Sequence, residues 1–202
     1  MKNKKIMNKI NCGLFVLTAR DGEKDNGCII NTVMQVTSTP NRITISVNKG
    51  NYTHDIIQKT GVFNVSILNE DSKFATYQNF GFQSGREADK FEQIEYARSE
   101  NGLIYLTAET NGFISAKVLY QINLDTHTLF IAEVTDGDVL SEVEPVTYSF
   151  YHKSIKPAAP KADEKKKGWV CTICGYIYEG EVLPPDFVCP ICKHGADDFR
   201  PL

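Results

Sequence analysis

The sequence predicts a mainly β protein, a barrel or sandwich with a few short helices, followed by a small domain held together by a metal ion. Two observations carry this prediction. Segments rich in β-branched and aromatic residues recur at short intervals through residues 1–155, which is typical of all-β barrels and sandwiches. Four of the six cysteines then fall within the last 32 residues, a stretch too short to bury a sufficient core by itself.

The first domain is expected to cover residues 1–155 as a series of short strands. Each is bounded by turn residues such as Gly, Asn, Asp and Pro. The expected strands are 13–19, 28–37, 42–48, 61–68, 103–108, 113–124, 128–135 and 145–151.

Two short helices are expected between these strands. One covers residues 54–60, with Thr53 as its N-cap and Gly61 just past its end. The other covers residues 72–79, with Asp71 as its N-cap. The polar segment after it is expected to form a surface excursion with a helical turn, and a loop of that length is more often functional than idle.

Composition changes abruptly after residue 155. Residues 156–167 contain no apolar side chain larger than Ala, two prolines and a run of charges, so ordering them would not repay its entropic cost. We expect a flexible linker here, spanning roughly 20 Å as a coil, and a separate domain over 168–202.

The charge balance is ordinary, with 22 Lys and Arg against 25 Asp and Glu, a net charge of −3. It does not point to nucleic acid, and no apolar run approaches the length of a membrane span. The basic start imitates a signal peptide, but the run 13–19 is short and fits a strand better, so a cytoplasmic location is expected. Cys12 and Cys28 are expected to be small apolar residues, not a redox pair.

The remaining cysteines form two Cys-x-x-Cys pairs separated by 14 residues. In each pair the backbone can turn so that both sulfurs face one point, and two such pairs give a tetrahedral cage of four sulfurs. The predicted metal ligands are Cys171, Cys174, Cys189 and Cys192. Spacing alone does not choose between iron and zinc. Five aromatic residues are expected to wall the metal: Trp169, Tyr176, Tyr178, Phe187 and Phe199.

Residues 168–202 resemble rubredoxin, through Trp-Val-Cys-Thr-Ile-Cys-Gly-Tyr-Ile-Tyr-Glu-Gly and Pro-Asp-Phe-Val-Cys-Pro-Ile-Cys. The resemblance implies one iron that carries single electrons. Two departures are present: the stretch between the pairs is short, as in the rubredoxin-like tails of rubrerythrins, and Lys193 stands where Gly is usual, which bears on hydrogen bonding to the sulfurs. A structural zinc ribbon is the alternative.

No Gly-x-Gly-x-x-Gly follows a strand and no P-loop is present. Residues 31–40 and 48–54 instead place hydroxyls, amides and Lys49 at a strand exit and a helix N-terminus, which suits a phosphate group. The alternative is purely local: Thr53 caps its helix, while Asn48 and Asn51 form a turn.

Residues 9–156 resemble the flavin reductase-like family of FMN-binding split barrels, in particular flavoredoxin and the flavin reductases fused to rubredoxin. Such a resemblance implies a homodimer with FMN at or near the subunit interface. The matching pieces are Asn31–Thr37, Asn51–His54, Gly61–Leu68, Ser84–Arg86, Asp89–Phe91, Asp125–Val134 and Tyr151–His152.

The same resemblance implies a set of flavin-binding residues, without assigning a catalytic one. The residues expected along the isoalloxazine ring and ribityl chain are Asn31, Thr32, Val33, Met34, Gln35, Val36 and Thr37. The residues expected at the phosphate are Thr32, Asn48, Lys49 and Thr53, with Lys90 at the flavin or its phosphate. His127 matches a histidine near the flavin face, where a nicotinamide stacks; a strand-end histidine with a satisfied hydrogen bond is the alternative. Met34 is equally explained by core packing, and Ala132 replaces a family Gly.

Together the two resemblances imply an enzyme that passes electrons from NADH or NADPH through FMN to a tethered iron. The iron then reduces an acceptor protein, for which the resemblance implies a flavodiiron oxygen or nitric oxide reductase of an anaerobe. Two alternatives stay open: a flavin reductase with a structural zinc tail, and a non-enzymatic carrier whose two centres are loaded by another protein.

Overall fold

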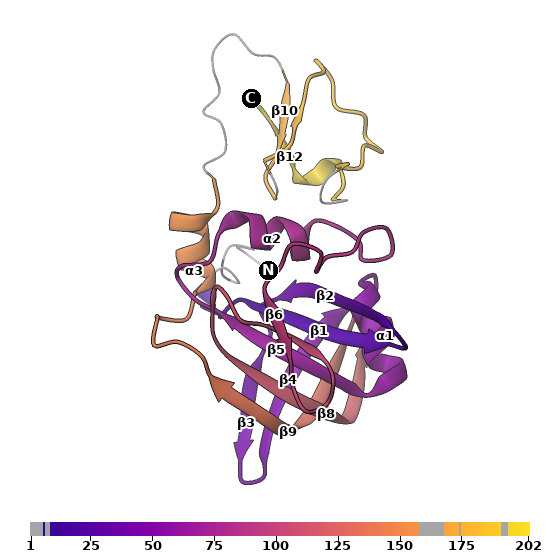
Figure 1. Ribbon diagram of the computed structural model, residues 1–202. Helices are drawn as coiled ribbons and strands as arrows, with labels where there is room; N and C mark the ends of the chain where they lie inside the picture. The colour runs from indigo at the N-terminus through magenta and orange to yellow at the C-terminus, as the bar shows by residue number, and fades with distance from the viewer. Residues whose placement is uncertain (1–5, 7–8, 158–167, 174, 191–193) are drawn as a thin grey trace.

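The computed structural model describes residues 6, 9–157, 168–173, 175–190 and 194–202 (Figure 1). Its main feature is a seven-stranded antiparallel sheet with the strand order β2-β1-β5-β8-β9-β4-β3. These strands are β1 (Phe15–Asp21), β2 (Lys24–Ile30), β3 (Met34–Ser38), β4 (Asn41–Asn48), β5 (Val62–Leu68), β8 (Thr110–Leu124) and β9 (His127–Val139). The mainly β fold expected from the sequence is confirmed.

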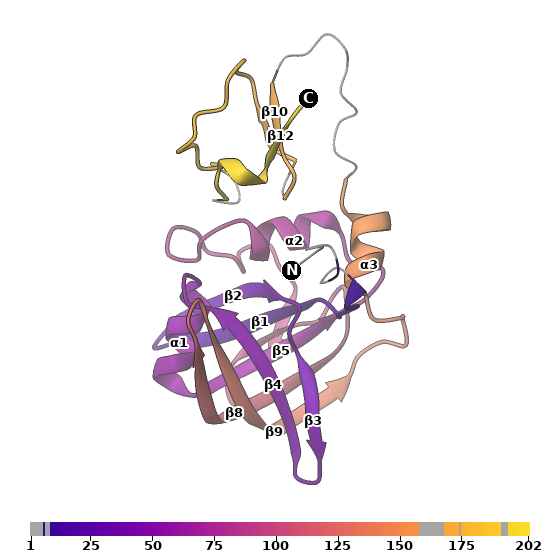
Figure 2. The ribbon, with the colours of Figure 1, turned by 180° about the vertical axis from the view of Figure 1, so that it is seen from behind.

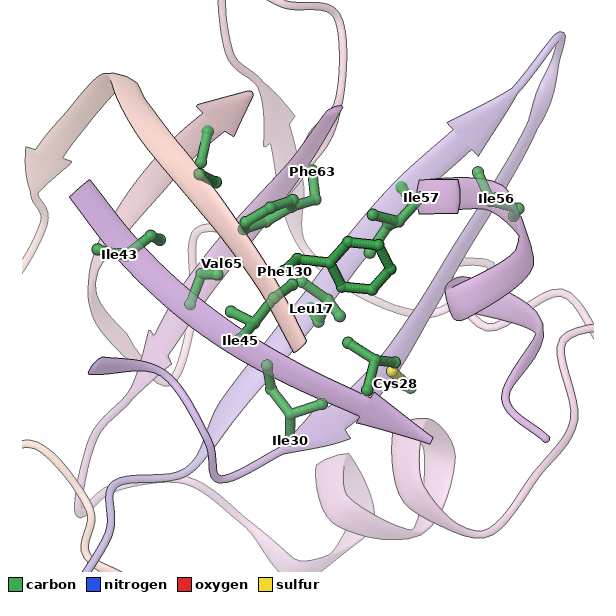
Figure 3. Packing of buried hydrophobic residues seen from close by; sticks show 14 residues of the cluster. Leu17, Cys28, Ile30, Ile43, Ile45, Ile56, Ile57, Phe63, Val65 and Phe130 are labelled. Carbon is green, nitrogen blue, oxygen red and sulfur yellow. The ribbon is translucent and has the colours of Figure 1, made fainter. Parts of the chain in front are cut away.

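The sheet curls around a core of buried aliphatic and aromatic side chains (Figure 3). Four of these side chains are 0% exposed and come from four different strands: Leu17, Ile45, Phe63 and Phe130. The helix α1 (Tyr52–Thr60) contributes its isoleucines to this core, and the left-handed Gly61, at φ 72°, ends the helix. Alternate side chains of the strands and the side chains on one face of the short helix α1 therefore pack into the same core.

A second core lies between the sheet and the helix α2 (Phe74–Gly81). In both views α2 runs along one side of the barrel, on the side away from the β3–β4 hairpin (Figures 1 and 2). A small hairpin of β6 (Tyr96–Arg98) and β7 (Ile104–Leu106) joins this core, as does α3 (Tyr148–Phe150), which runs directly into the π-helix η2 (Tyr151–Ile155). The segment 80–98 is thus only partly the surface excursion that was expected, because Phe91 is buried in it.

Two of the expected strands were wrong in number or type. The expected strand 28–37 is two strands, since the chain turns after Ile30 before β3 begins. The expected strand 145–151 is mainly helical: the Thr147 side chain accepts a hydrogen bond from Phe150 N at 3.2 Å and starts α3. Its β-favouring aromatic residues are used in packing against α2, with the Tyr77 and Tyr151 rings 4.5 Å apart.

The helix starts also differ from the prediction. The N-cap of α1 is Asn51 and not Thr53, because the Asn51 side chain accepts a hydrogen bond from Thr53 N at 3.1 Å. The helix α2 begins at Phe74, and Glu109, distant in sequence, accepts a hydrogen bond from Lys73 N at 3.0 Å. Among the described residues, no helix is both long enough and apolar enough to cross a membrane.

The C-terminal domain contains a three-stranded sheet in which β10 (Trp169–Cys171) pairs with both β11 (Ile177–Tyr178) and β12 (Phe199–Pro201). A 3-10 turn, η3 (Ala196–Asp198), precedes the last strand. The aromatic residues singled out in the sequence pack together here, as expected: Trp169, Tyr176, Tyr178, Phe187 and Phe199. The linker expected over 156–167 lies, after Pro157, outside the described residues.

The barrel core gives a direct test of stability. Replacing Leu17, which has 0% exposure on the central strand β1, with Ala is expected to lower the free energy of unfolding by about 2–5 kcal/mol, because a cavity remains. The matched change Leu140→Ala, at 37% exposure, is expected to cost less than about 1 kcal/mol. Urea unfolding followed by circular dichroism measures both. Equal losses would contradict this account of the core.

Candidate functional site

A pocket of about 440 Å³ lies between the start of α1 and the end of α2. This volume is within the range of pockets that hold cofactors and other small molecules. Its walls come from the β4–α1 turn, from the segment that follows α2, and from one residue of the C-terminal domain. The lining residues are Asn48, Gly50, Asn51, Tyr52, Phe80–Gly85, Lys90 and His194.

The first turn of α1 is held to the barrel by a short chain of hydrogen bonds. Asn51 caps the helix, and Thr53, fully buried, accepts a hydrogen bond from Asn26 Nδ2 at 2.9 Å. Gly85 packs directly on the Asn26 side chain, so closely that a Cβ at Gly85 would collide with Oδ1. The same Oδ1 is buried without a hydrogen-bond partner in the described part of the chain. Glycine is therefore required at position 85. Because the pocket lies at the start of α1, the positive end of the helix dipole also faces it.

Lys90 places a buried cation in the pocket wall. Its side chain is 5% exposed, and Nζ donates hydrogen bonds to Gly27 O at 2.9 Å and to Phe80 O at 3.1 Å. Burial lowers the pKa of Lys90 to about 8, although the nearby Cys28 acts in the opposite direction. Burial also raises the pKa of Cys28, despite hydrogen bonds from Thr53 and Asn51, so this thiol stays protonated, as a small core residue would.

Two further cations lie over the ring of Tyr52, a residue of the pocket wall. The Arg86 guanidinium lies 4.5 Å from the ring centroid and Lys24 Nζ lies 5.1 Å from it. Arg86 also donates to Asp55 Oδ2 at 2.5 Å. Burial raises the pKa of Asp55, but the hydrogen bonds from His54 and Arg86 outweigh this and hold that pKa below its usual range. The start of α1 is thus electropositive, which favours an anionic group.

Four of the seven residues predicted to line the flavin ring, Met34–Thr37, lie on one exposed edge. Residues 34–38 are β3, all exposed, and Met34 is 61% exposed, so it is not a core residue. The Thr32 hydroxyl donates a hydrogen bond to Ser46 O at 2.8 Å. Because Ser46 lies two residues before Asn48, this bond links the exposed edge to the pocket at α1. Val33 and Gln35 line a different cavity, of about 700 Å³, over β4, β8 and β9.

The predicted residues therefore do not all share one pocket. Asn48 and Lys90 line the pocket at α1, with Thr53 buried just behind it. Lys49 instead donates to Asn123 Oδ1 at 2.5 Å and lines a third cavity, of about 290 Å³. His127 pairs with Asn48 in the β4–β9 register. Its Nδ1 lies 2.9 Å from Thr126 Oγ1, which is the local hydrogen bond expected of a strand-end histidine without a role at the flavin.

The C-terminal domain brings two of the predicted metal ligands to its centre. Cys171 and Cys189 are both 0% exposed. Gly175 adopts φ 82°, and its N–H donates to Cys171 O at 2.9 Å, which is the tight turn a Cys-x-x-Cys-Gly knuckle needs. Two buried thiols inside an aromatic shell suit thiolate coordination of iron or zinc. Cys174, Cys192 and Lys193 lie outside the described residues.

Comparison with known proteins agrees with this two-part architecture. Residues 7–158 match the flavin reductase like domain. The chain belongs to this family. Residues 169–200 match the rubredoxin-like domain of rubrerythrin, which is the short-spaced type expected from the sequence. The protein is therefore an oxidoreductase that joins a flavin-binding domain to an iron-thiolate domain for electron transfer.

Three relatives show the same arrangement or part of it. The chain is 37% identical over 226 aligned residues to the high molecular weight rubredoxin of Moorella thermoacetica, covering 98% of this chain and 99% of that protein. It is 36% identical to the ferric-chelate reductase (NAD(P)H) of Archaeoglobus fulgidus, over 76% of this chain and 90% of that protein. The solved flavin reductase PheA2 has a TM-score of 0.61 and 26% identity, over 71% of this chain and 89% of that structure.

Several residues of the pocket in the flavin reductase-like domain were not assigned a role from the sequence. Tyr52 and His194 line it, Asn26 bonds Thr53 behind it and Arg86 lies over the Tyr52 ring; these residues come from four separate segments, and only the fold brings them together. Asn51-Tyr52 and Ser84–Arg86 were noted as matching pieces, which was the one available signal for this region.

Burial of the Lys90 ammonium makes the stability of the flavin reductase-like domain depend on pH. Lys90 loses its proton at about pH 8 when folded, against an ordinary pKa of 10.5, so the unfolded chain binds more protons between these values. Stability of the flavin-free protein is therefore expected to rise with pH, by about 1 kcal/mol between pH 8 and 9. Lys90→Met removes this rise, whereas Lys153→Met, an exposed lysine, retains it. Urea unfolding at each pH measures the slope, and a rise that persists in Lys90→Met would refute the assignment.

The rubredoxin-like domain is expected to depend on its metal. Cys171→Ser should reduce bound iron from about one per chain to about a tenth or less, and should unfold this domain while the barrel remains folded. Cys12→Ser, at a half-buried cysteine of the other domain, serves as the matched control and should retain iron. Elemental analysis and calorimetry measure the two effects. Undiminished iron in Cys171→Ser would show that the knuckle does not bind it.

Proposed function

We propose that the protein is an NAD(P)H-dependent oxidoreductase that binds FMN in the barrel and delivers single electrons through the iron of its rubredoxin-like domain to an acceptor protein. The observation that carries this proposal is the presence of both domains in one chain. The nicotinamide donor is supported by the relative named a ferric-chelate reductase (NAD(P)H). The resemblance stated above supports a flavodiiron protein as the acceptor.

The pocket at α1 suits the phosphate end of FMN. Its helix N-terminus, Asn48 and the ammonium of Lys90 supply the donors and the positive charge that a phosphate dianion needs. Thr32 and Ser46 connect this pocket to β3, where backbone amides and the exposed edge of residues 34–38 are available to the ring. We therefore place the phosphate at α1 and the ring along β3.

A homodimer is supported by an exposed apolar surface on the same part of the barrel. The outer half of β8 pairs only with β9, and its side chains are exposed. Contiguous exposed apolar surfaces of several hundred Å² mark interaction sites. Its exposed large side chains, with those of β3, are Met34, Val36, Leu119, Tyr120, Ile122 and Leu124. A second subunit on this surface would cover the ring-binding edge.

The bound flavin supplies the conversion between a two-electron donor and a one-electron acceptor. One NAD(P)H gives up a hydride, which carries two electrons, and becomes NAD(P)⁺. Two ferric ions are therefore reduced to ferrous for each nicotinamide oxidised. The chain's own residues hold the phosphate, neutralise its charge and line the ring, and the tether keeps the iron at a high local concentration.

An anaerobic titration of the purified holoprotein with NADH, and separately with NADPH, tests this function. We expect the flavin absorbance to bleach first and the ferric-thiolate absorbance to follow, with three electrons taken up per chain at the end of the titration, two by the flavin and one by the iron. A chain that ends at Pro157 should retain flavin reduction and lose electron delivery to the acceptor.

Three results would overturn the proposal or part of it. An iron band that stays oxidised beside reduced flavin would break the relay. Zinc in place of iron would favour a flavin reductase with a structural tail. Two centres that ignore both nicotinamides would make the protein a carrier loaded by another reductase.

A further inference from the structure

The C-terminal domain contacts its own barrel at two described points. Lys156 Nζ, at the end of η2, donates a hydrogen bond to Thr172 O at 2.7 Å. His194 lines the pocket at α1 together with Tyr52, Phe82 and Lys90. In both views the domain lies over α2, on the side of the barrel away from the β3–β4 hairpin (Figures 1 and 2).

Each contact point is attached to one of the two metal knuckles. Thr172 directly follows the ligand Cys171, and its N–H and hydroxyl donate to Asp198 O at 2.8 Å and 2.9 Å. The carbonyl of His194 accepts a hydrogen bond from the N–H of Cys189 at 2.8 Å. The domain therefore turns its cysteine edge, and not its opposite face, toward the barrel.

We propose that the rubredoxin-like domain docks in cis, with its cysteine edge over the mouth of the α1 pocket of the same chain. Lys156 anchors the first knuckle through Thr172, and His194 beside the second knuckle completes the pocket wall. This arrangement sets the iron-binding domain of one chain at the phosphate end of the flavin site proposed for the same chain. Given the proposed function, on which this step rests, electrons pass one at a time from reduced flavin to iron within one chain: the flavin loses one electron and one ferric ion becomes ferrous.

A reversible contact suits a domain that also has to leave. A hydrogen bond from an ammonium to a carbonyl is strong enough to bias an orientation, yet it is weak beside a permanent interface. The 12 residues from Lys156 to Lys167 keep the domain at a high effective concentration over the pocket, so even a weak contact is populated. The docked form serves intramolecular transfer, and the undocked form exposes the same cysteine edge to an acceptor.

Paramagnetic broadening measures the docking without any turnover. The full-length holoprotein is labelled with nitrogen-15, and amide signals of the ferric form are compared with those of the zinc-substituted form. We expect the strongest broadening at Tyr52 and Phe82–Gly85, and little at Asn41 in the β3–β4 hairpin on the far side. Uniform broadening, or broadening centred on β3, would overturn the proposed orientation.

A matched pair of variants tests the anchor. Lys156→Ala is expected to reduce the broadening at Tyr52 by about threefold or more, because the docked fraction falls when a charged hydrogen bond is lost. Lys153→Ala, at an exposed lysine three residues earlier, should match the wild type. Unchanged broadening in Lys156→Ala would refute the anchor, and neither variant alters a metal ligand.

Mixed chains distinguish docking in cis from docking on another subunit. Labelled zinc-substituted chains are mixed with unlabelled ferric chains, and native mass spectrometry confirms that subunits have exchanged. Docking in cis leaves the labelled amides sharp, whereas broadening would place the domain on a neighbouring chain and overturn the proposal. Because none of these spectra involves NADH, failure of the docking and failure of the proposed function give separate signatures.

Discussion

The candidate flavin pocket depends on one buried ammonium group. Lys90 Nζ donates to the carbonyls of Gly27 in β2 and Phe80 in α2, so a single side chain joins the segment after α2 to both elements. Desolvation of this charge is costly, which is why its pKa falls to about 8, and the two carbonyl acceptors offset part of that cost. This buried lysine fixes both the shape of the pocket and the charge in its wall.

The parts of the fold that the sequence predicted are those that local physics determines. The strands β4 and β5 were expected within one residue of their ends, because alternation and turn residues specify them in place. The start of α2 was wrong because the backbone of its N-cap residue, Lys73, is held by the distant Glu109, which no local pattern reveals. Residues 145–151 were expected as a strand because the aromatic residues favour β structure, whereas packing against Tyr77 selects helix.

The same distinction separates the two candidate sites. The metal site is encoded in two short knuckles, so Cys171 and Cys189 could be singled out from spacing alone, and both are buried among the expected aromatic residues. The pocket at α1 is assembled from segments far apart in sequence, and Lys90 came from a resemblance and not from a pattern. Its burial, the Asn26–Thr53 hydrogen bond and the place of His194 follow only from the tertiary structure.

The rigid origin of the tether explains how one hydrogen bond can help to orient a whole domain. Tyr151 is 7% exposed and packs 4.5 Å from the Tyr77 ring, and its carbonyl accepts a hydrogen bond from Lys156 N at 2.7 Å. The backbone of Lys156 is therefore fixed to the aromatic core before its side chain reaches Thr172. Because the anchor is already ordered, forming the contact costs the entropy of one side chain and not that of a loop. A contact with this low entropic cost can be reversible and specific at once, which a domain that alternates between its own flavin and a separate acceptor requires.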